Sequence, residues 1–251
     1  MTHRMLPTVA MALAGIVAAP AVATAAPTSA PATALTAAAS PSAHVTRTAP
    51  TSGTAKAAPY VHKVDVDGDG RRDTVTLSLA GARGDKNLYR LSVWTAARRS
   101  AATTVAVAID NHLPPKDLWL GAADFDGVRG NEILLDLGGG LGDFAFPHTY
   151  TWRGGKLTLL PAPGSTRTVK SWTVAWPPFA AQGFTFSTAR GVRYVVRHDL
   201  AGSRSGRAFS GTHTTYRWTG RTWATVATKK SGVLTAKAAQ RYSGFHGLVW
   251  R

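Results

Sequence analysis

The sequence contains no cysteine, which excludes disulfides, cysteine-ligated zinc, iron–sulfur clusters, thiol nucleophiles and a lipid-modified cysteine anchor. Acids are scarce, since 13 Asp and Glu stand against 29 Lys and Arg in 251 residues, giving a formal net charge of +16. No apolar run reaches the ~20 residues that a comfortable membrane span needs. Hydrophobic residues nevertheless make up 44% of the chain. The chain can therefore build a packed core, and disorder throughout is excluded.

The positive charge is concentrated in the second half of the sequence. Residues 1–143 carry 12 acids and 13 bases, whereas residues 144–251 carry 16 bases and one acid, Asp199. An excess of this size indicates an anionic partner without saying which one.

The N-terminus is typical of a secretory signal peptide over residues 1–25. Arg4 precedes a short apolar run at 9–19, and small residues around 21–25 offer cleavage sites. The alternative is an anchor that is kept. Residues 26–59 are rich in Ala, Pro, Thr and Ser without apolar periodicity, which is typical of a disordered linker. We therefore expect a secreted protein with no membrane span once the signal is cleaved.

From residue 60 onward the pattern is that of short β-strands separated by Gly and Pro, with one short helix expected near 234–242. A period of about 60 residues divides this region into three related segments, about 60–118, 119–178 and 179–251. Each segment has a loop followed by a strand, and later a tryptophan-bearing hairpin. The Gly154-Gly155 and Thr219-Gly220 steps suit tight hairpin turns that need positive φ. The sequence predicts an all-β domain of about three degenerate, blade-like antiparallel repeats, forming a partial propeller or a sandwich-like arrangement.

The most specific motif is the loop of residues 65–73, DVDGDGRRD, directly before a predicted strand. Calcium takes about six to eight oxygen ligands, and acids at loop positions 1, 3, 5 and 9 can all turn inward if the loop coils tightly. An EF-hand is excluded, because Thr76 stands at position 12 and a β-branched run follows. The sequence predicts calcium ligands at Asp65, Asp67, Asp69, Asp73 and the carbonyl of Arg71. The alternative is a surface turn that binds no metal.

Two further segments repeat this loop in weaker form. Residues 124–132 keep acids at positions 1, 3 and 9 (Asp124, Asp126 and Glu132), but Val128 stands at position 5. This second loop is either a weaker calcium site or a turn held by its own hydrogen bonds. Residues 185–193 have lost every acid, and Arg193 stands at position 9. That segment is expected to form an ordinary turn, or to place a guanidinium where a cation would lie.

The first two loops and the strands after them resemble FG-GAP and VCBS-type repeats, which occur in integrin α-subunit propellers and in many secreted bacterial proteins. In those repeats a D-x-D-G-D-G-x-x-D loop precedes a strand and binds calcium within a β-blade. The resemblance implies calcium binding and a blade-like fold. The Phe-Gly and Gly-Ala-Pro elements of the family are not evident, and three repeats are too few for a closed propeller.

No catalytic motif is recognisable, since G-x-S-x-G and H-E-x-x-H are absent and S-x-x-K does not occur in the β-region. His198 and Asp199, with Ser203 or Ser205 nearby, leave a triad open on sequence alone. The catalytic residues of any activity are unknown at this point.

The C-terminal segment interleaves arginines with aromatic residues, which either belong to the core or stack on a ligand. We expect an anion-binding surface formed by Arg190, Arg193, Arg197, Arg204, Arg207, Arg217 and Arg221. The leading hypothesis is a non-catalytic module that binds an anionic polymer such as a cell-wall component, with nucleic acid as a non-specific possibility. The alternatives are a secreted hydrolase with an unrecognised active site and a protein–protein interaction module.

Overall fold

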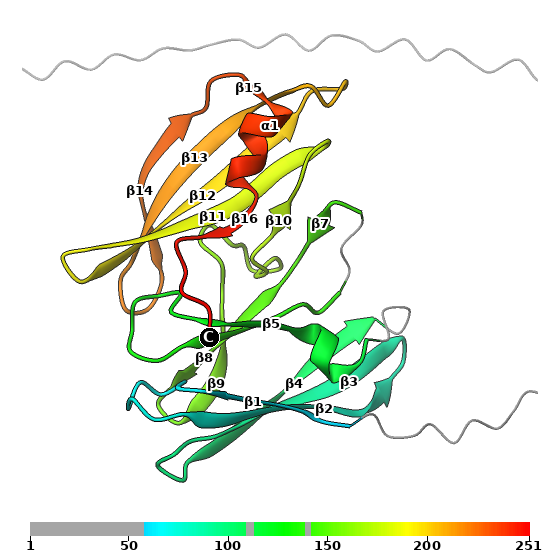
Figure 1. Cartoon of the computed structure of the whole chain (residues 1–251), viewed down its shortest axis with the longest axis vertical. Helices are drawn as coiled ribbons and strands as arrows, with labels where there is room; N and C mark the ends of the chain where they lie inside the picture. The colour runs from blue at the N-terminus through cyan, green and yellow to red at the C-terminus, as the bar shows by residue number, and fades with distance from the viewer. Residues whose placement is uncertain (1–57, 109–112, 139–141) are drawn as a thin grey trace, which may run out of the picture. The chain divides into compact units, whose positions relative to one another are not determined.

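A computed structural model describes residues 58–108, 113–138 and 142–251 of the chain (Figure 1). The predicted signal peptide, 1–25, and nearly all of the predicted linker, 26–59, lie outside these ranges. The described residues fall within one compact unit, Ser52–Arg251. None of the helices within these ranges is long and apolar enough to cross a membrane.

The first sheet contains four antiparallel strands in chain order: β1 (Tyr60–Val64), β2 (Asp73–Arg83), β3 (Lys86–Trp94) and β4 (Ser100–Ala108). Side chains alternate along them, so Val75 and Leu77 are buried while Thr74 and Thr76 lie on the other face. This period of two arises because one face covers the core and the other faces solvent.

The second sheet has the same strand pattern: β5 (Trp119–Ala123), β6 (Glu132–Leu135), β8 (His148–Arg153) and β9 (Lys156–Leu160), preceded by the 3₁₀-helix η2 (Pro115–Leu118). All four residues of β6 are buried, because both faces of this strand are covered. The turn from β8 to β9 uses Gly154 and Gly155, both with positive φ. This confirms the tight hairpin predicted at that position.

The third sheet is larger and runs β14-β13-β12-β11-β10-β7. Its long strands are β11 (Ala180–Ala189), β12 (Val192–Gly202), β13 (Ala208–Trp218) and β14 (Trp223–Lys230), and its short ones are β7 (Phe144–Ala145), β10 (Val174–Ala175), β15 (Leu234–Thr235) and β16 (Gly244–His246). The predicted helix is short: α1 (Ala236–Ala239) is capped by Thr235 and followed by η3 (Gln240–Tyr242). Figure 1 shows α1 lying over this sheet, where it contacts β13.

Three clusters of buried side chains join these layers. One fills the space between the first and second sheets around Leu77, Leu91 and Ile133. A second, rich in aromatic rings, joins the second sheet to the third around Phe125 and Trp172. The third lies under α1 and η3. The predicted all-β class is therefore confirmed.

The segment 185–193 contains the ordinary turn expected there, but the turn is confined to two residues. Thr185 lies inside β11 and Arg193 inside β12, and only Arg190 and Gly191 form the turn between these strands. Both turn residues have positive φ, 51° and 74°, which suits a two-residue hairpin. Without carboxylates to fold a loop around, this segment pairs as β-structure on both sides of the two-residue turn.

Candidate cation site

The two acidic loops fold with the same internal hydrogen bonds. In each, the position-1 carboxylate accepts the N–H of position 4, the position-3 carboxylate accepts that of position 5, and the position-9 carboxylate accepts that of position 2. The pairs are Gly68 to Asp65 (2.7 Å), Asp69 to Asp67 (3.2 Å) and Val66 to Asp73 (2.8 Å) in the first loop, and Gly127 to Asp124 (2.6 Å), Val128 to Asp126 (2.9 Å) and Phe125 to Glu132 (2.7 Å) in the second. This shared pattern explains why the spacing recurs in the sequence.

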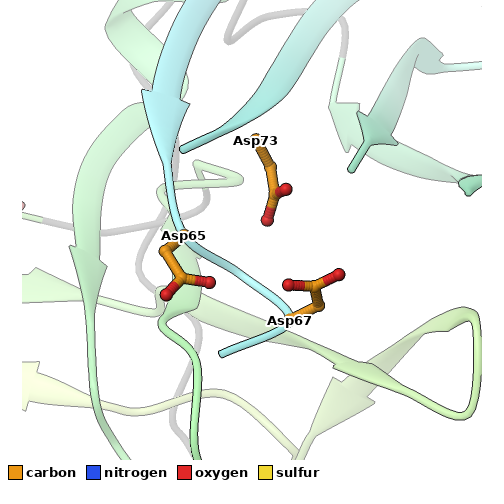
Figure 2. A group of neighbouring side chains, drawn as sticks. All are labelled: Asp65, Asp67 and Asp73. Atoms are coloured by element: carbon orange, nitrogen blue, oxygen red, sulfur yellow. The ribbon is translucent and has the colours of Figure 1, made fainter. Parts of the chain in front are cut away.

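In the first loop, Asp65, Asp67 and Asp73 bring carboxylate oxygens within 4.8 Å of one another, an arrangement that could hold a metal ion. Figure 2 shows the three carboxylates directed toward a common space. Asp69 is not part of this group. Its Oδ2 lies 2.7 Å from Nη2 of Arg71 at the surface, so that the two partly exposed side chains pair with each other. Of the predicted acidic ligands, three therefore converge and one turns away.

Within the described ranges, the three converging carboxylates form no ion pair with a positive side chain. Their hydrogen-bond donors are backbone amides, including the N–H of Ala96, which donates to the buried Asp73 (2.8 Å). Burial, and then the charges of the other three loop acids, raises the pKa of Asp67, although the N–H of Asp69 opposes the shift. The cluster carries a formal charge of −3 that a hard cation with oxygen ligands would offset.

The second loop also brings three acids within the same 4.8 Å limit, and this group could likewise hold a metal ion. Here, however, two guanidinium groups already contact it. Arg153 donates to both oxygens of Asp126 (2.9 and 2.8 Å) and to Glu132 (3.1 Å). Arg193, from β12, lies 2.5 Å from Asp124 and also donates to its backbone carbonyl (2.8 Å). Three carboxylates and two guanidinium groups leave a formal charge of −1.

Burial dominates the electrostatics of this second group. It raises the pKa of Glu132 to about 8, with the charge of Asp126 adding to the shift and the N–H of Phe125 and Arg153 opposing it. Burial raises the pKa of Asp126 as well, again against Arg153. Asp126 and Glu132 thus share one guanidinium, and burial disfavours the charged form of both carboxyl groups.

Arg153 was not assigned a role by sequence reasoning. It follows Trp152 at the end of β8, 21 residues after Glu132, and only the pairing of β6 with β8 brings the two together. The corresponding residue after the hairpin tryptophan of the first repeat is Thr95, which is uncharged and buried. The available signal in the sequence was that, of the residues that follow the three hairpin tryptophans, Arg153 alone is charged.

The first two segments are joined through close backbone contacts. The backbone and side-chain amides of Asn131 both donate to the carbonyl of Asp65 (2.9 and 2.7 Å), which ties the second loop to the first. Gly130 has φ +108°, and a Cβ there would lie 2.4 Å from the carbonyl oxygen of Val66. These contacts place both acidic loops at the same end of the sheets.

The predicted anion-binding arginines do not form one cluster. Arg193 and Arg197 are taken up by ion pairs with Asp124 and Asp199. The other five are exposed and fall into two groups: Arg190, Arg217 and Arg221 near the β11–β12 and β13–β14 turns, and Arg204 and Arg207 in the β12–β13 turn. The 11-residue strand β12 separates these ends by about 30 Å.

His198 and Asp199 do not form a triad with Ser203 or Ser205. Asp199 pairs with Arg197, and Ser203 bonds Ser205 and the N–H of Ala208. The imidazole of His198 instead contacts Nδ1 of His213 (2.7 Å) and Oγ1 of Thr185 (2.8 Å), and Tyr242 covers both rings. A 2.7 Å contact between two ring nitrogens needs a proton on one of them and none on the other. Burial, with the charges of His213 and His246, lowers the pKa of His198 to about 4.

No known protein family, curated protein or solved structure matches this chain.

Proposed function

We propose that the protein is a secreted, calcium-stabilised, non-catalytic β-repeat module that binds an anionic extracellular polymer, such as a cell-wall glycopolymer. One observation carries this proposal. Among the residues that the structure describes, Arg153, Arg193 and Arg197 are the only ones of the 16 bases in 144–251 that form ion pairs, and Arg197 already engages the one acid of that region. Thirteen bases therefore have no acidic partner within the described ranges, which favours an external polyanion.

The separation of the exposed arginines supports a polymer rather than a small anion. Arg190, Arg217 and Arg221 near one end of the third sheet, and Arg204 and Arg207 at the other, are too far apart to contact one phosphate or carboxylate. An extended chain with repeating charges can reach both groups. Each contact adds to affinity by releasing counterions, so binding should weaken steeply as salt rises.

Calcium is the cation that best suits the first loop. All three converging ligands are carboxylates, their formal charge is −3, and extracellular modules bind calcium at about 0.1–1 mM. The resemblance of this loop to FG-GAP and VCBS-type repeats supports the same assignment. Bound there, calcium would stabilise the fold by mass action, because the unfolded chain has no preformed site.

The polymer hypothesis is tested by retention of the purified protein on isolated wall glycopolymer over a salt series. We expect binding at low salt that falls steeply with salt. Replacing Arg190, Arg217 and Arg221 by Gln should flatten that dependence, because each lost phosphate contact reduces the logarithmic slope by about one. The matched control replaces Arg83, Arg98 and Arg99, which are exposed in the first repeat, and should keep the slope. Absence of retention at low salt would overturn the hypothesis.

Calcium binding is tested by melting curves in calcium and in a chelator. We expect a higher melting temperature in calcium and loss of that shift in Asp67→Asn. Asp69→Asn is the matched control, since the Asp69 carboxylate pairs with Arg71 outside the cluster and its removal should keep the shift. Superimposable wild-type curves in calcium and chelator would contradict the assignment.

A further inference from the structure

The outer face of the first sheet carries an exposed tryptophan that the core does not explain. Leu91 and Val93 of β3 point inward and are buried, whereas Trp94 follows them with 56% of its surface exposed. An indole left in water forgoes the stabilisation that burial of so large a ring would provide.

Small polar side chains surround this ring. Strand register places Thr74 and Ser100 beside Trp94, and Thr76 and Ala102 beside Ser92. Because these neighbours are small, the sheet surface is hollowed between Trp94 and Arg90, and the two long side chains line the same hollow of about 340 Å³. The floor offers hydroxyl groups, which both donate and accept hydrogen bonds.

The charge on this face has one sign. Arg90 is exposed and forms no ion pair within the described part of the chain, and the ammonium group of Lys63 contacts the hydroxyl of Thr74 beside the tryptophan. The only acid in β1–β4 is Asp73, which is buried on the other face. A ligand on this surface therefore meets an aromatic ring, hydroxyl groups and two cations, and no carboxylate.

We propose that this face binds an acidic glycan, with one sugar ring stacked on Trp94 and an anionic substituent of a nearby sugar held by Arg90. The two residues lie four positions apart along β3, about 13 Å at ~3.3 Å per residue, which is within reach of neighbouring sugars in a chain. The C–H face of a sugar packs on an aromatic ring, and the guanidinium fork matches a carboxylate or a phosphate. The inference rests on the proposed function for the anionic nature of the polymer, and adds to it a sugar-specific site.

The experiment compares four probes with the purified protein: polygalacturonate, which has rings and carboxylates; glycosylated teichoic acid, which has sugar rings on a phosphate-bearing backbone; inorganic polyphosphate, which has charge without rings; and dextran, which has rings without charge. Trp94→Ala should weaken binding to polygalacturonate or to teichoic acid at least about fivefold. The probe that is affected identifies the anionic group. Binding to polyphosphate should be unchanged, and dextran should bind far more weakly than the acidic glycan.

Two further variants keep the outcome interpretable. Phe179→Ala removes an aromatic ring that is 71% exposed and distant in sequence from this face, and should bind like wild type. Ser92→Tyr fills the hollow without removing Trp94, and should reproduce the loss. If Trp94→Ala binds both acidic glycans like wild type, the sugar site is wrong while the proposed function stands. If wild type binds none of the three anionic probes at low salt, the proposed function fails and this site with it.

Discussion

The second acidic loop gives the sharpest prediction, because the chain itself supplies its cation. Arg153→Thr installs the residue that follows the hairpin tryptophan in the first repeat. It leaves the side chains of Asp126 and Glu132, which are at most 1% exposed, without their shared guanidinium. Removing one partner from a buried charge pair costs about 3–5 kcal/mol. Since the Arg153 side chain is itself 31% exposed, we expect the free energy of unfolding to fall by about 3 kcal/mol in chelator.

The assay is urea unfolding followed by circular dichroism, in chelator and over a calcium series that extends to about a hundredfold above the dissociation constant. Removing Arg153 changes the formal charge of the loop from −1 to −2, and three carboxylate oxygens still converge there. Calcium should therefore restore about 2–3 kcal/mol once it exceeds its dissociation constant about a hundredfold. Arg129→Thr is the control: this arginine is exposed and forms no ion pair among the residues described, so its loss should change stability by less than about 0.5 kcal/mol.

Two results would refute this reasoning. If Arg153→Thr is as stable as wild type in chelator, the guanidinium does not compensate the buried acids. If the variant is destabilised equally with and without the divalent cation, the second loop cannot exchange a guanidinium for a metal. The double variant with Glu132→Gln separates charge repulsion from lost packing, because removing one carboxylate should recover stability only in the first case.

Acid should destabilise the fold through the histidine pair. Because His198 has a folded pKa of about 4, below the usual ~6.5, the unfolded chain takes up the proton first, so stability is present above pH 6.5 and is lost as pH falls toward 4. The expected loss is about 2 kcal/mol after allowing for solvent screening, and His213→Asn should reduce it in urea titrations across pH. Gly130→Ala should cost at least about 2 kcal/mol, because its Cβ would clash with Val66. Gly154→Ala, with φ +56° and no atom near the added carbon, should cost only about 1 kcal/mol by the same measurement.

Local patterns in the sequence predicted those parts of the fold that local physics decides. The alternation in β2 reflects a sheet with one covered face, and the recurring loop spacing reflects hydrogen bonds within nine residues. The hairpin at Gly154 and Gly155 follows from the positive φ that its turn requires. Ion-pair partners that only strand pairing brings together could not be predicted from the sequence. Arg153 and Arg193 contact residues of the second loop that lie 21 and 69 positions earlier in the sequence, and no periodic pattern in the sequence predicts those contacts.

The turn expected at 185–193 is present, but it is much shorter than the loops of the first two repeats. The loop fold of the first two repeats depends on carboxylates that accept backbone N–H groups, so a segment that has lost them has no acceptors to coil around. Its Thr, Phe and Val residues instead favour strand pairing, which satisfies the same backbone groups in a ladder. The segment matches the first two loops in its position within the repeat, but it lacks the carboxylates that fold those loops.

The ion pairs show which basic residues are neutralised within the protein and which are not. Arg153 and Arg193 come from the basic half of the sequence, yet both neutralise acids of the second loop, and Arg197 neutralises the one acid of its own half. Three of the 16 bases in residues 144–251 therefore form ion pairs with acids of the same chain. None of these 16 bases forms an ion pair with the first loop among the residues described, and we propose that a metal ion offsets its three converging carboxylates. The remaining 13 bases form no ion pair among the residues described, and the polyanion proposed above would supply their counter-charge.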